Sequence, residues 1–215
     1  MANYKYLFFD LDGTLTDSAE GILNSIEYAL GKFGVEVTDK RELNRFLGPP
    51  LVEAFMEFYG FSEEKAKQTV VYYRERFREI GIFENRVYDG IPQLLEELKR
   101  KGYILVIATS KPEEYAKRIA DHFDLTHYFT YIAGATFDGK IGTKQEVIEY
   151  AINKLNIENK RDILMIGDRH HDAKGAAAVG IDCLGVLYGY GDRAELEEAG
   201  ATHIVESVID INKIL

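Results

Sequence analysis

The sequence has little cysteine, fewer basic than acidic side chains, and no apolar run of membrane-spanning length. Its single cysteine, Cys183, excludes an internal disulfide bond and a thiolate metal cluster, and its apolar surroundings predict a small core residue. The formal net charge of −10 argues against a duplex nucleic acid partner, which would require a basic face. The amino-terminal residues lack a signal-peptide pattern, so we expect a cytoplasmic protein with no membrane partner.

Apolar residues make up 46% of the 215 positions, which is enough to bury a sizeable core. Short apolar runs, of the kind found in parallel strands covered on both faces, recur at 6–10, 104–110, 131–134, 162–168, 183–189 and 203–206. Stretches with apolar residues at helical spacing lie between the later runs. This alternation predicts an α/β fold with a parallel sheet and right-handed crossovers.

One connection is far longer than a parallel crossover requires, because most of a hundred residues separate the first two apolar runs. Residues 16–87 show helical periodicity and no convincing strand, and we expect Tyr73, Phe77 and Ile80 to be ordinary core positions. We therefore predict an α-helical cap domain at 16–87, inserted into a Rossmann-like core domain formed by 1–15 and 88–215. Helices that merely lengthen one face of the core are the alternative.

Two carboxylates, Asp10 and Asp12, stand one residue apart directly after the first apolar run. An aspartate can attack phosphorus and hold the phosphoryl group as an aspartyl-phosphate. A second carboxyl group close by can move the protons that the attack and its reversal require. By itself the pattern is weak, because Asp-Gly also makes ordinary turns.

Ligands of open α/β sheets bind outside the carboxyl ends of the strands, so the polar residues at those ends test this idea. Such residues are present at Thr109, Ser110, Lys144, Asp168 and Asp172. Clustered carboxylates would repel by about 4 kcal/mol per pair at 4 Å and an effective dielectric of about 20, and a hard dication such as Mg²⁺ would remove that repulsion. Ser110 can donate to phosphate oxygens, and Lys144 can neutralise charge in the transition state.

Asp-x-Asp-Gly-Thr, a Thr/Ser after the second strand, a lysine and Gly-Asp-x-x-x-Asp, in that order, resemble the four motifs of the haloacid dehalogenase superfamily. The resemblance covers essentially the whole chain, and the inserted cap is similar to that of the phosphoglycolate phosphatase and β-phosphoglucomutase branch. It implies that Asp10 is the nucleophile and Asp12 the general acid/base. It also implies that Mg²⁺ is held by Asp10, the main-chain carbonyl of Asp12 and Asp168, with Asp172 in support.

The resemblance further implies which residues bind the phosphate of the substrate. Lys144 is the phosphate lysine, and Thr109 or Ser110 supplies the hydroxyl. Spacing from the strand favours Thr109 as the motif residue, with Ser110 helping through its backbone N–H. Gly13 of the first motif is also expected at the substrate.

The segment at 46–51 resembles the cap loop of phosphoglycolate phosphatase and 5′-nucleotidase-like members. Substrate choice should lie in the cap, because the core supplies the same chemistry to any monophosphate. We therefore predict that Gly48 and the preceding Arg45 bind substrate. A plain interhelix turn and a solvated arginine are the alternatives.

Two other features invite different interpretations. The adjacent His170 and His171 could suggest a metal site, but sequence neighbours do not normally face one metal, and we expect Arg169 and His171 to brace their loop. The helix at 72–78 mixes aromatic residues with arginines. Its spacing is that of ordinary core positions, so we do not interpret it as a nucleic-acid platform.

Together these observations predict a Mg²⁺-dependent phosphatase that hydrolyses a small phosphorylated metabolite, similar to phosphoglycolate or a nucleoside monophosphate, through an aspartyl-phosphate. Asp12 argues against a dehalogenase, since those enzymes resemble this fold but lack an acid/base there. Thr14 stands where the resemblance to phosphomutases would favour Val or Ile, and this difference favours a phosphatase. A sugar phosphomutase of the β-phosphoglucomutase type is the alternative enzyme. A non-catalytic binding or regulatory protein on the same fold is the alternative of another class. The sequence is compatible with a monomer or a homodimer.

Overall fold

The computed structural model describes residues 4–215. The chain divides into two compact units: a core unit made of the residues up to Asp17 together with Val87–Leu215, and a cap unit made of Ser18–Arg86. The sequence placed these divisions at 15/16 and 87/88.

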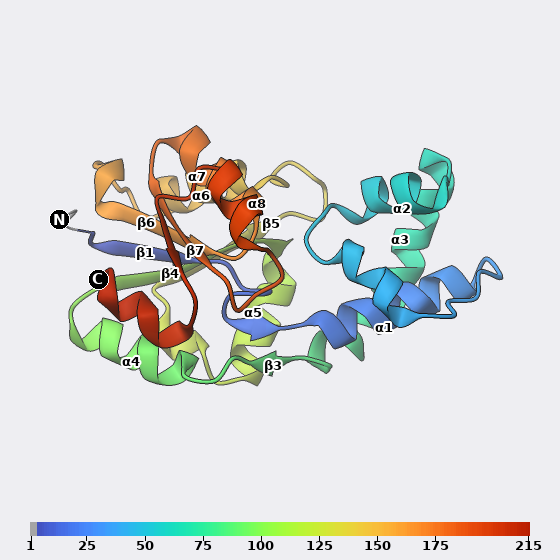
Figure 1. Cartoon of the computed structure of the whole chain (residues 1–215), viewed down its shortest axis with the longest axis horizontal. Helices are drawn as coiled ribbons and strands as arrows, with labels where there is room; N and C mark the ends of the chain where they lie inside the picture. Colours follow the sequence, from blue (N-terminus) through green and yellow to red (C-terminus); the bar gives the residue numbers. More distant parts are fainter. Residues whose placement is uncertain (1–3) are drawn as a thin grey trace. The chain divides into compact units, whose positions relative to one another are not determined.

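The core unit is built on a six-stranded sheet with the order β5-β4-β1-β6-β7-β8 (Figure 1). All neighbouring strands run parallel. The strands are β1 (Tyr6–Phe9), β4 (Ile104–Pro112), β5 (Tyr131–Ala135), β6 (Ile163–Gly167), β7 (Asp182–Val186) and β8 (His203–Val205). This arrangement confirms the predicted α/β fold, and it places β1 and β6, which carry two of the predicted motifs, side by side in the sheet centre.

Helices connect the strands and cover both faces of the sheet. They are α4 (Ile91–Arg100), α5 (Glu113–His122), α6 (Lys144–Lys154), α7 (His170–Val179) and α8 (Arg193–Glu198), with short 3₁₀ turns at η3 (Thr126–Tyr128), η4 (Lys160–Asp162) and η5 (Val208–Lys213). α6 begins at a capping box in which Thr143 accepts from the Glu146 N–H. α7 ends at Gly180, whose φ of +81° is the left-handed conformation that glycine adopts without steric cost.

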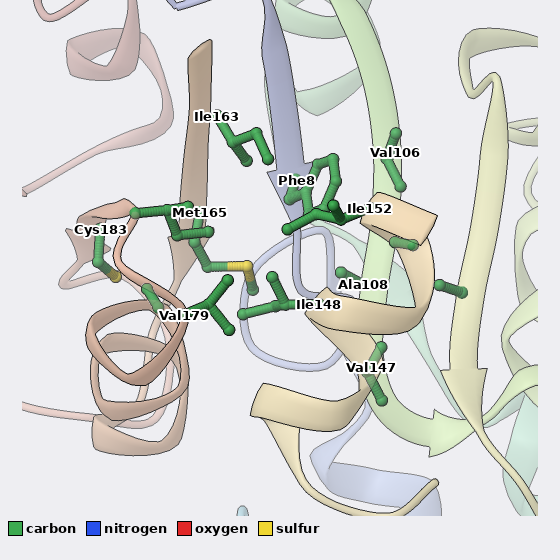
Figure 2. Packing of buried hydrophobic residues seen from close by; sticks show 14 of the residues in the cluster. Phe8, Val106, Ala108, Val147, Ile148, Ile152, Ile163, Met165, Val179 and Cys183 are labelled. Atoms are coloured by element: carbon green, nitrogen blue, oxygen red, sulfur yellow. The ribbon is translucent and has the colours of Figure 1, made fainter. Parts of the chain in front are cut away.

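The core between the sheet and helices α6 and α7 is apolar and closely packed (Figure 2). Phe8, Val106 and Met165 come from three adjacent strands and face the helices, where Ile148 lies among them. Cys183 belongs to the same cluster and is 2% exposed, as the sequence predicts for a core residue. Residues on the opposite face of β1 are equally buried, which is characteristic of a sheet with helices on both sides.

Two short strands, β2 (Thr16–Asp17) and β3 (Arg86–Val87), form a separate two-stranded sheet. They are the segments in which the chain leaves the core unit and returns to it. No sequence pattern predicts these strands, because two residues are too few for a periodicity to emerge.

The cap unit is helical, and its elements are α1 (Ala19–Gly31), η1 (Lys40–Phe46), α2 (Leu51–Tyr59), α3 (Glu63–Phe77) and η2 (Gly81–Phe83). α3 packs against both α1 and α2. Aromatic rings fill its interior, with Phe46 and Phe55 in contact at a centroid distance of 5.0 Å. No helix within residues 4–215 combines the length and the apolar character that a membrane crossing requires.

The interpretation of α3 as an ordinary packed helix is correct for Tyr73 and Phe77, which are buried. It is wrong for Ile80, which lies beyond the end of the helix and is 55% exposed. Periodicity alone extended the stripe one turn too far. An ion pair spans the turn that follows the helix, because the two terminal guanidinium nitrogens of Arg76 donate to the Glu84 carboxylate at 2.7 and 2.8 Å.

Candidate active site

The predicted functional residues of the core gather at the carboxyl edge of the sheet. Asp10 follows the last residue of β1, and Asp168 follows the last residue of β6. The backbone N–H of Asp10 still donates to the Ile166 carbonyl at 2.9 Å, so the two strands remain paired up to the first carboxylate. Parallel pairing in register therefore brings together carboxylates that are far apart in the sequence.

Three carboxylates form the centre of the site. Asp10, Asp168 and Asp172 each offer an oxygen atom, and these atoms lie within 4.8 Å of one another. Asp168 and Asp172 are fully buried. Grouped oxygen ligands of this kind suit a hard cation such as Mg²⁺, and burial of this much negative charge is costly without a cation. The donor set therefore fits the predicted metal.

Lys144 compensates two of these carboxylates. It is the first residue of α6, and its Nζ lies 2.8 Å from Asp10 Oδ1 and 2.8 Å from Asp172 Oδ1. Nζ also donates to the Ala108 carbonyl at 2.9 Å. Burial opposes the charge of the lysine, but the two carboxylates prevail and raise its pKa. Gly175 of α7 permits this approach, because a Cβ there would lie 2.8 Å from Lys144 Cγ.

The two buried carboxylates have perturbed pKa values for related reasons. Burial raises the pKa of Asp172 to about 6; Lys144 lowers it, and the charge of Asp10 raises it. Burial also raises the pKa of Asp168 well above its ordinary value, and the negative charges of Asp172 and Asp10 add to that rise. A bound dication would favour the ionised forms of both.

Asp168 differs from its neighbours in its hydrogen-bond donors, which are neutral. The Thr14 hydroxyl donates to Asp168 Oδ1 at 3.1 Å, and the Tyr190 backbone N–H donates to Asp168 Oδ2 at 2.8 Å. Three glycines let the backbone close around this carboxylate. A Cβ at Gly13, Gly189 or Gly191 would lie 2.2, 2.4 and 2.1 Å, respectively, from the side-chain Oδ2, the Cβ and the main-chain oxygen of Asp168.

Gly13 was predicted to bind substrate, and the structure gives it a definite packing role. Its φ is +81°, and its N–H donates to the Thr16 carbonyl in a tight turn. Sequence reasoning missed the loop at 188–191, which follows β7. The signal was there in two glycines alternating with tyrosines directly after an apolar strand.

Asp12 has a cationic partner that the sequence analysis did not single out. Lys111 Nζ lies 2.8 Å from Asp12 Oδ2, and the lysine side chain is only 6% exposed. Within residues 4–215, Asp12 Oδ1 is buried and accepts no hydrogen bond. The side chain is thus held through one oxygen, and its role as the general acid/base stays a prediction.

The two hydroxyl candidates after β4 differ in environment. Thr109 is 2% exposed, and its hydroxyl oxygen accepts from the Lys111 backbone N–H at 3.2 Å. Ser110 is exposed. Both lie at the carboxyl end of β4, next to β1 in the sheet, as the motif requires. Which hydroxyl contacts phosphate remains a prediction, with Thr109 favoured.

Glu195 of α8 braces the loop that follows β6. It accepts from the His170 backbone N–H at 2.8 Å and from Arg169 Nε at 2.8 Å, and it lies 2.6 Å from His170 Nδ1. Burial would raise the pKa of Glu195, but these contacts lower it to about 2. The expected brace from Arg169 is therefore present. The expectation for His171 is wrong, because its buried Nε2 has no hydrogen-bond partner within residues 4–215, and the neighbouring His170 supplies the second contact. Burial lowers the pKa of His171 to about 4.

Arg45 and Gly48, the predicted substrate-binding residues of the cap, both belong to the cap unit. The Arg45 guanidinium lies over the Phe58 ring at 4.6 Å and is exposed. Gly48 is exposed with a φ of +114°, a conformation that a side chain would strain. Their contact with substrate stays a prediction.

Comparisons with known proteins show the family to which the chain belongs. The family model described as Haloacid dehalogenase-like hydrolase matches residues 7–186. A "5'-nucleotidase" of Pseudomonas aeruginosa is 44% identical over 99% of this chain and 96% of its own length. A "Tyrosine-protein kinase PtkA" of Mycobacterium tuberculosis is 40% identical over 98% of this chain and 71% of its own, and "Phosphoglycolate phosphatase 1" of P. aeruginosa is 25% identical over 96% and 78%. The crystal structure of a predicted phosphatase from Clostridium acetobutylicum has a TM-score of 0.94 at 51% identity and covers 98% of this chain and 97% of that one.

The chain belongs to the haloacid dehalogenase-like hydrolase family. The predictions of this family, of its α/β fold and of a phosphoric monoester hydrolase are thereby confirmed.

Proposed function

We propose that the protein is a Mg²⁺-dependent phosphatase that acts on a nucleoside monophosphate or a similarly small phosphomonoester through an aspartyl-phosphate at Asp10. The observation that carries the proposal is the cluster of Asp10, Asp168 and Asp172 with Lys144 between two of them. Mg²⁺, when bound, would screen the charge of the phosphate and of the carboxylates. Asp10, Asp168 and Asp172 would hold it, together with the main-chain carbonyl of Asp12.

The first chemical step belongs to Asp10. Its carboxylate attacks phosphorus while the ester P–O bond breaks, and Asp12 in its acid form gives a proton to the departing alkoxide oxygen. Lys144 holds Asp10 in one orientation through Oδ1, so little reorganisation is needed at the moment of attack. The Thr109 hydroxyl and the backbone amides near it would orient the phosphoryl oxygens.

The second step reverses the roles of the proton donor and acceptor. Asp12, now a carboxylate, accepts a proton from the attacking water, and the acyl-phosphate bond breaks to release phosphate and regenerate Asp10. Lys111 holds Asp12 Oδ2 at 2.8 Å, which leaves Oδ1 to face this proton transfer. Atoms and charges balance over the two steps, since one water enters and an alcohol and a phosphate leave.

A nucleoside monophosphate is the favoured substrate because the relative named 5'-nucleotidase is 44% identical along nearly the whole chain, whereas the one named Phosphoglycolate phosphatase 1 is 25% identical. Arg45 and Gly48 of the cap are the residues that we propose for selection among esters. The exposed Arg45 could meet a carboxylate or sugar hydroxyl of the substrate.

The test is phosphate release from a panel of nucleoside 5′-monophosphates, phosphoglycolate and hexose phosphates, with Mg²⁺ or with EDTA. Asp10→Asn should lower the rate by about 10³-fold or more, while Asp124→Asn, at a side chain that is 98% exposed, should leave it unchanged. Radiolabelled phosphate should be trapped on Asp10 after acid quench. Label recovered on another side chain would refute the mechanism, and a hexose phosphate isomerised faster than it is hydrolysed would favour the phosphomutase.

A second candidate function rests on the relative named Tyrosine-protein kinase PtkA, which is 40% identical over 98% of this chain. The acceptor of the phosphoryl group would then be a phenol oxygen in place of water. Incubation with ATP labelled in its γ-phosphate and a tyrosine-containing peptide separates the two functions. Label in the peptide supports the kinase, and label released only as inorganic phosphate excludes it.

A further inference from the structure

The loop after β7 makes contacts in two directions. The Tyr190 backbone N–H donates to Asp168 Oδ2 at 2.8 Å, and the Tyr190 phenol donates to Asp17 Oδ1 at 3.2 Å. Asp168 is one of the three clustered carboxylates. Asp17 is the second residue of β2 and the last residue of the core unit before the chain enters the cap. One residue therefore contacts both the carboxylate cluster and the strand that ends the first segment of the core unit.

Tyr188, the other tyrosine of this loop, lies near the point where the chain returns to the core unit. The Tyr188 phenol donates to the Thr14 carbonyl at 2.9 Å, and its ring contacts Tyr88 edge-to-face with centroids 5.1 Å apart. Tyr88 immediately follows β3, and its N–H donates to the Leu15 carbonyl. The loop at 188–191 thus contacts the chain near the end of the core's first segment and at the start of its second.

The carboxylate that this loop holds is the one most sensitive to a cation. Lys144 pairs with Asp10 and Asp172, while the donors on Asp168 are the neutral Thr14 hydroxyl and Tyr190 amide. A dication at the cluster would therefore change the electrostatic environment of Asp168 more than that of its neighbours. The position and rigidity of Asp168 should follow the occupancy of the cluster.

The contact between Asp168 and the loop is too tight to absorb such a change locally. Gly189 and Gly191 bring the loop so close that a Cβ on either would overlap Asp168 atoms at 2.4 and 2.1 Å. Tyr188 is half-buried and its phenol donates to the Thr14 carbonyl at 2.9 Å, so this end of the loop is held in place as well. A shift or stiffening of Asp168 is passed to the Tyr190 backbone because the packed interior has little free space.

We propose that Tyr190 is a positioning residue that couples occupancy of the carboxylate cluster at Asp168 to strand β2 through Asp17. The proposal rests on the magnesium site of the proposed function. Coupling is reciprocal: if Mg²⁺ stabilises β2, the intact contact between Tyr190 and Asp17 strengthens Mg²⁺ binding by the same factor. One hydrogen bond of ordinary net strength corresponds to a factor of about five.

The experiment compares hydrogen–deuterium exchange of peptides that cover residues 14–18, with and without Mg²⁺, and measures Mg²⁺ affinity by calorimetry. In the unaltered protein, Mg²⁺ should slow exchange at β2 by about fivefold. Tyr190→Phe removes the phenol hydroxyl but keeps the amide on Asp168. We expect it to abolish the slowing and to weaken Mg²⁺ binding by about the same factor.

Two further variants make the result specific. Asp17→Ala removes the acceptor and should reproduce both effects, and the double variant with Tyr190→Phe should show no additional loss. Tyr131→Phe is the matched control, because it removes a phenol hydroxyl bonded to Tyr150 elsewhere in the core and should retain the Mg²⁺ response.

The outcomes separate the inference from the function on which it rests. Mg²⁺-dependent slowing that persists in Tyr190→Phe, or additive losses in the double variant, would overturn the coupling while leaving the phosphatase intact. Absence of Mg²⁺ binding in the unaltered protein would overturn both. A loss in Tyr131→Phe equal to that in Tyr190→Phe would show a general packing effect and refute the role of Tyr190.

Discussion

Replacing Lys144 with methionine should convert a compensated carboxylate cluster into an uncompensated one. The substitution keeps most of the side-chain volume and removes the ammonium group that lies 2.8 Å from Asp10 and 2.8 Å from Asp172. The lysine side chain is 3% exposed, so water cannot replace the lost charge without opening the core. We therefore expect a large effect on stability as well as on activity.

The magnitude follows from the burial of the partners. Breaking a buried ion pair by removing one member costs about 3–5 kcal/mol, because the remaining charge is left without a partner. For a chain of this size each kcal/mol lowers the melting temperature by about 2–4 °C, so Lys144→Met should lose about 6–20 °C in EDTA. Lys117→Met, at an exposed pair with Glu113, should change the free energy of unfolding by less than about 1 kcal/mol.

The stability deficit of Lys144→Met should depend on pH. Lys144 lowers the pKa of Asp172 in the folded protein, so without the lysine that pKa rises further, and the folded protein binds a proton more tightly than the unfolded chain. The stability deficit of Lys144→Met should therefore shrink at pH 5 and grow at pH 8. Mg²⁺ should recover part of the deficit, because the dication replaces the missing positive charge.

Thermal unfolding of both variants at pH 5 and pH 8, with EDTA or Mg²⁺, measures all of these quantities. A deficit that is the same at both pH values and with or without Mg²⁺ would refute the electrostatic reasoning. It would mean that Lys144 acts on stability only through the shape of its side chain.

Three further predictions concern other parts of the core. Glu195→Gln should lower the melting temperature at pH 7 by about 3–6 °C. Because the pKa of Glu195 is lowered to about 2 in the folded protein, its stabilising effect is lost when the carboxylate is protonated. The difference in melting temperature from the unaltered protein should therefore vanish as pH falls from 4.5 toward 2. Gly191→Ala should cost about 1–3 kcal/mol in urea unfolding, because its Cβ would meet the Asp168 carbonyl oxygen at 2.1 Å, whereas Gly31→Ala, with open space around it, should be neutral or stabilising. In EDTA, the free energy of unfolding measured relative to Asp172→Asn should fall by about 3 kcal/mol as pH rises from about 4 to 6, because the pKa of Asp172 is raised to about 6 in the folded state; a rise over that window would contradict the assignment.

The sequence was sufficient to predict the carboxylate cluster because parallel strands bring their carboxyl ends to the same edge of the sheet. Asp10 and Asp168 each follow an apolar strand, and in-register pairing of β1 with β6 leaves them no other place than one edge. Lys144 was accessible for the same reason, as the first residue of the helix after a strand.

Other parts of the site could not be predicted, since they depend on tertiary contacts that leave no local pattern. Glu195 reaches the loop at Arg169 from a helix 26 residues further along the chain. Lys111 pairs with Asp12 only because β4 and β1 are neighbours in the sheet. Ile80 shows the opposite error, in which a local pattern continued past the point where the helix ended.

The solitary thiol of Cys183 gives this molecule a built-in reporter of global opening. The side chain lies inside the packed cluster between sheet and helices (Figure 2). Burial raises the pKa of the thiol and shields it from solvent, so the reactive thiolate does not form and alkylating reagents do not reach it while the fold is intact. Alkylation of Cys183 therefore measures the fraction of molecules in which this core has unfolded. The chain can thus be assayed for kinetic durability without introducing any label, and a cysteine engineered on its surface would be modified against a silent background.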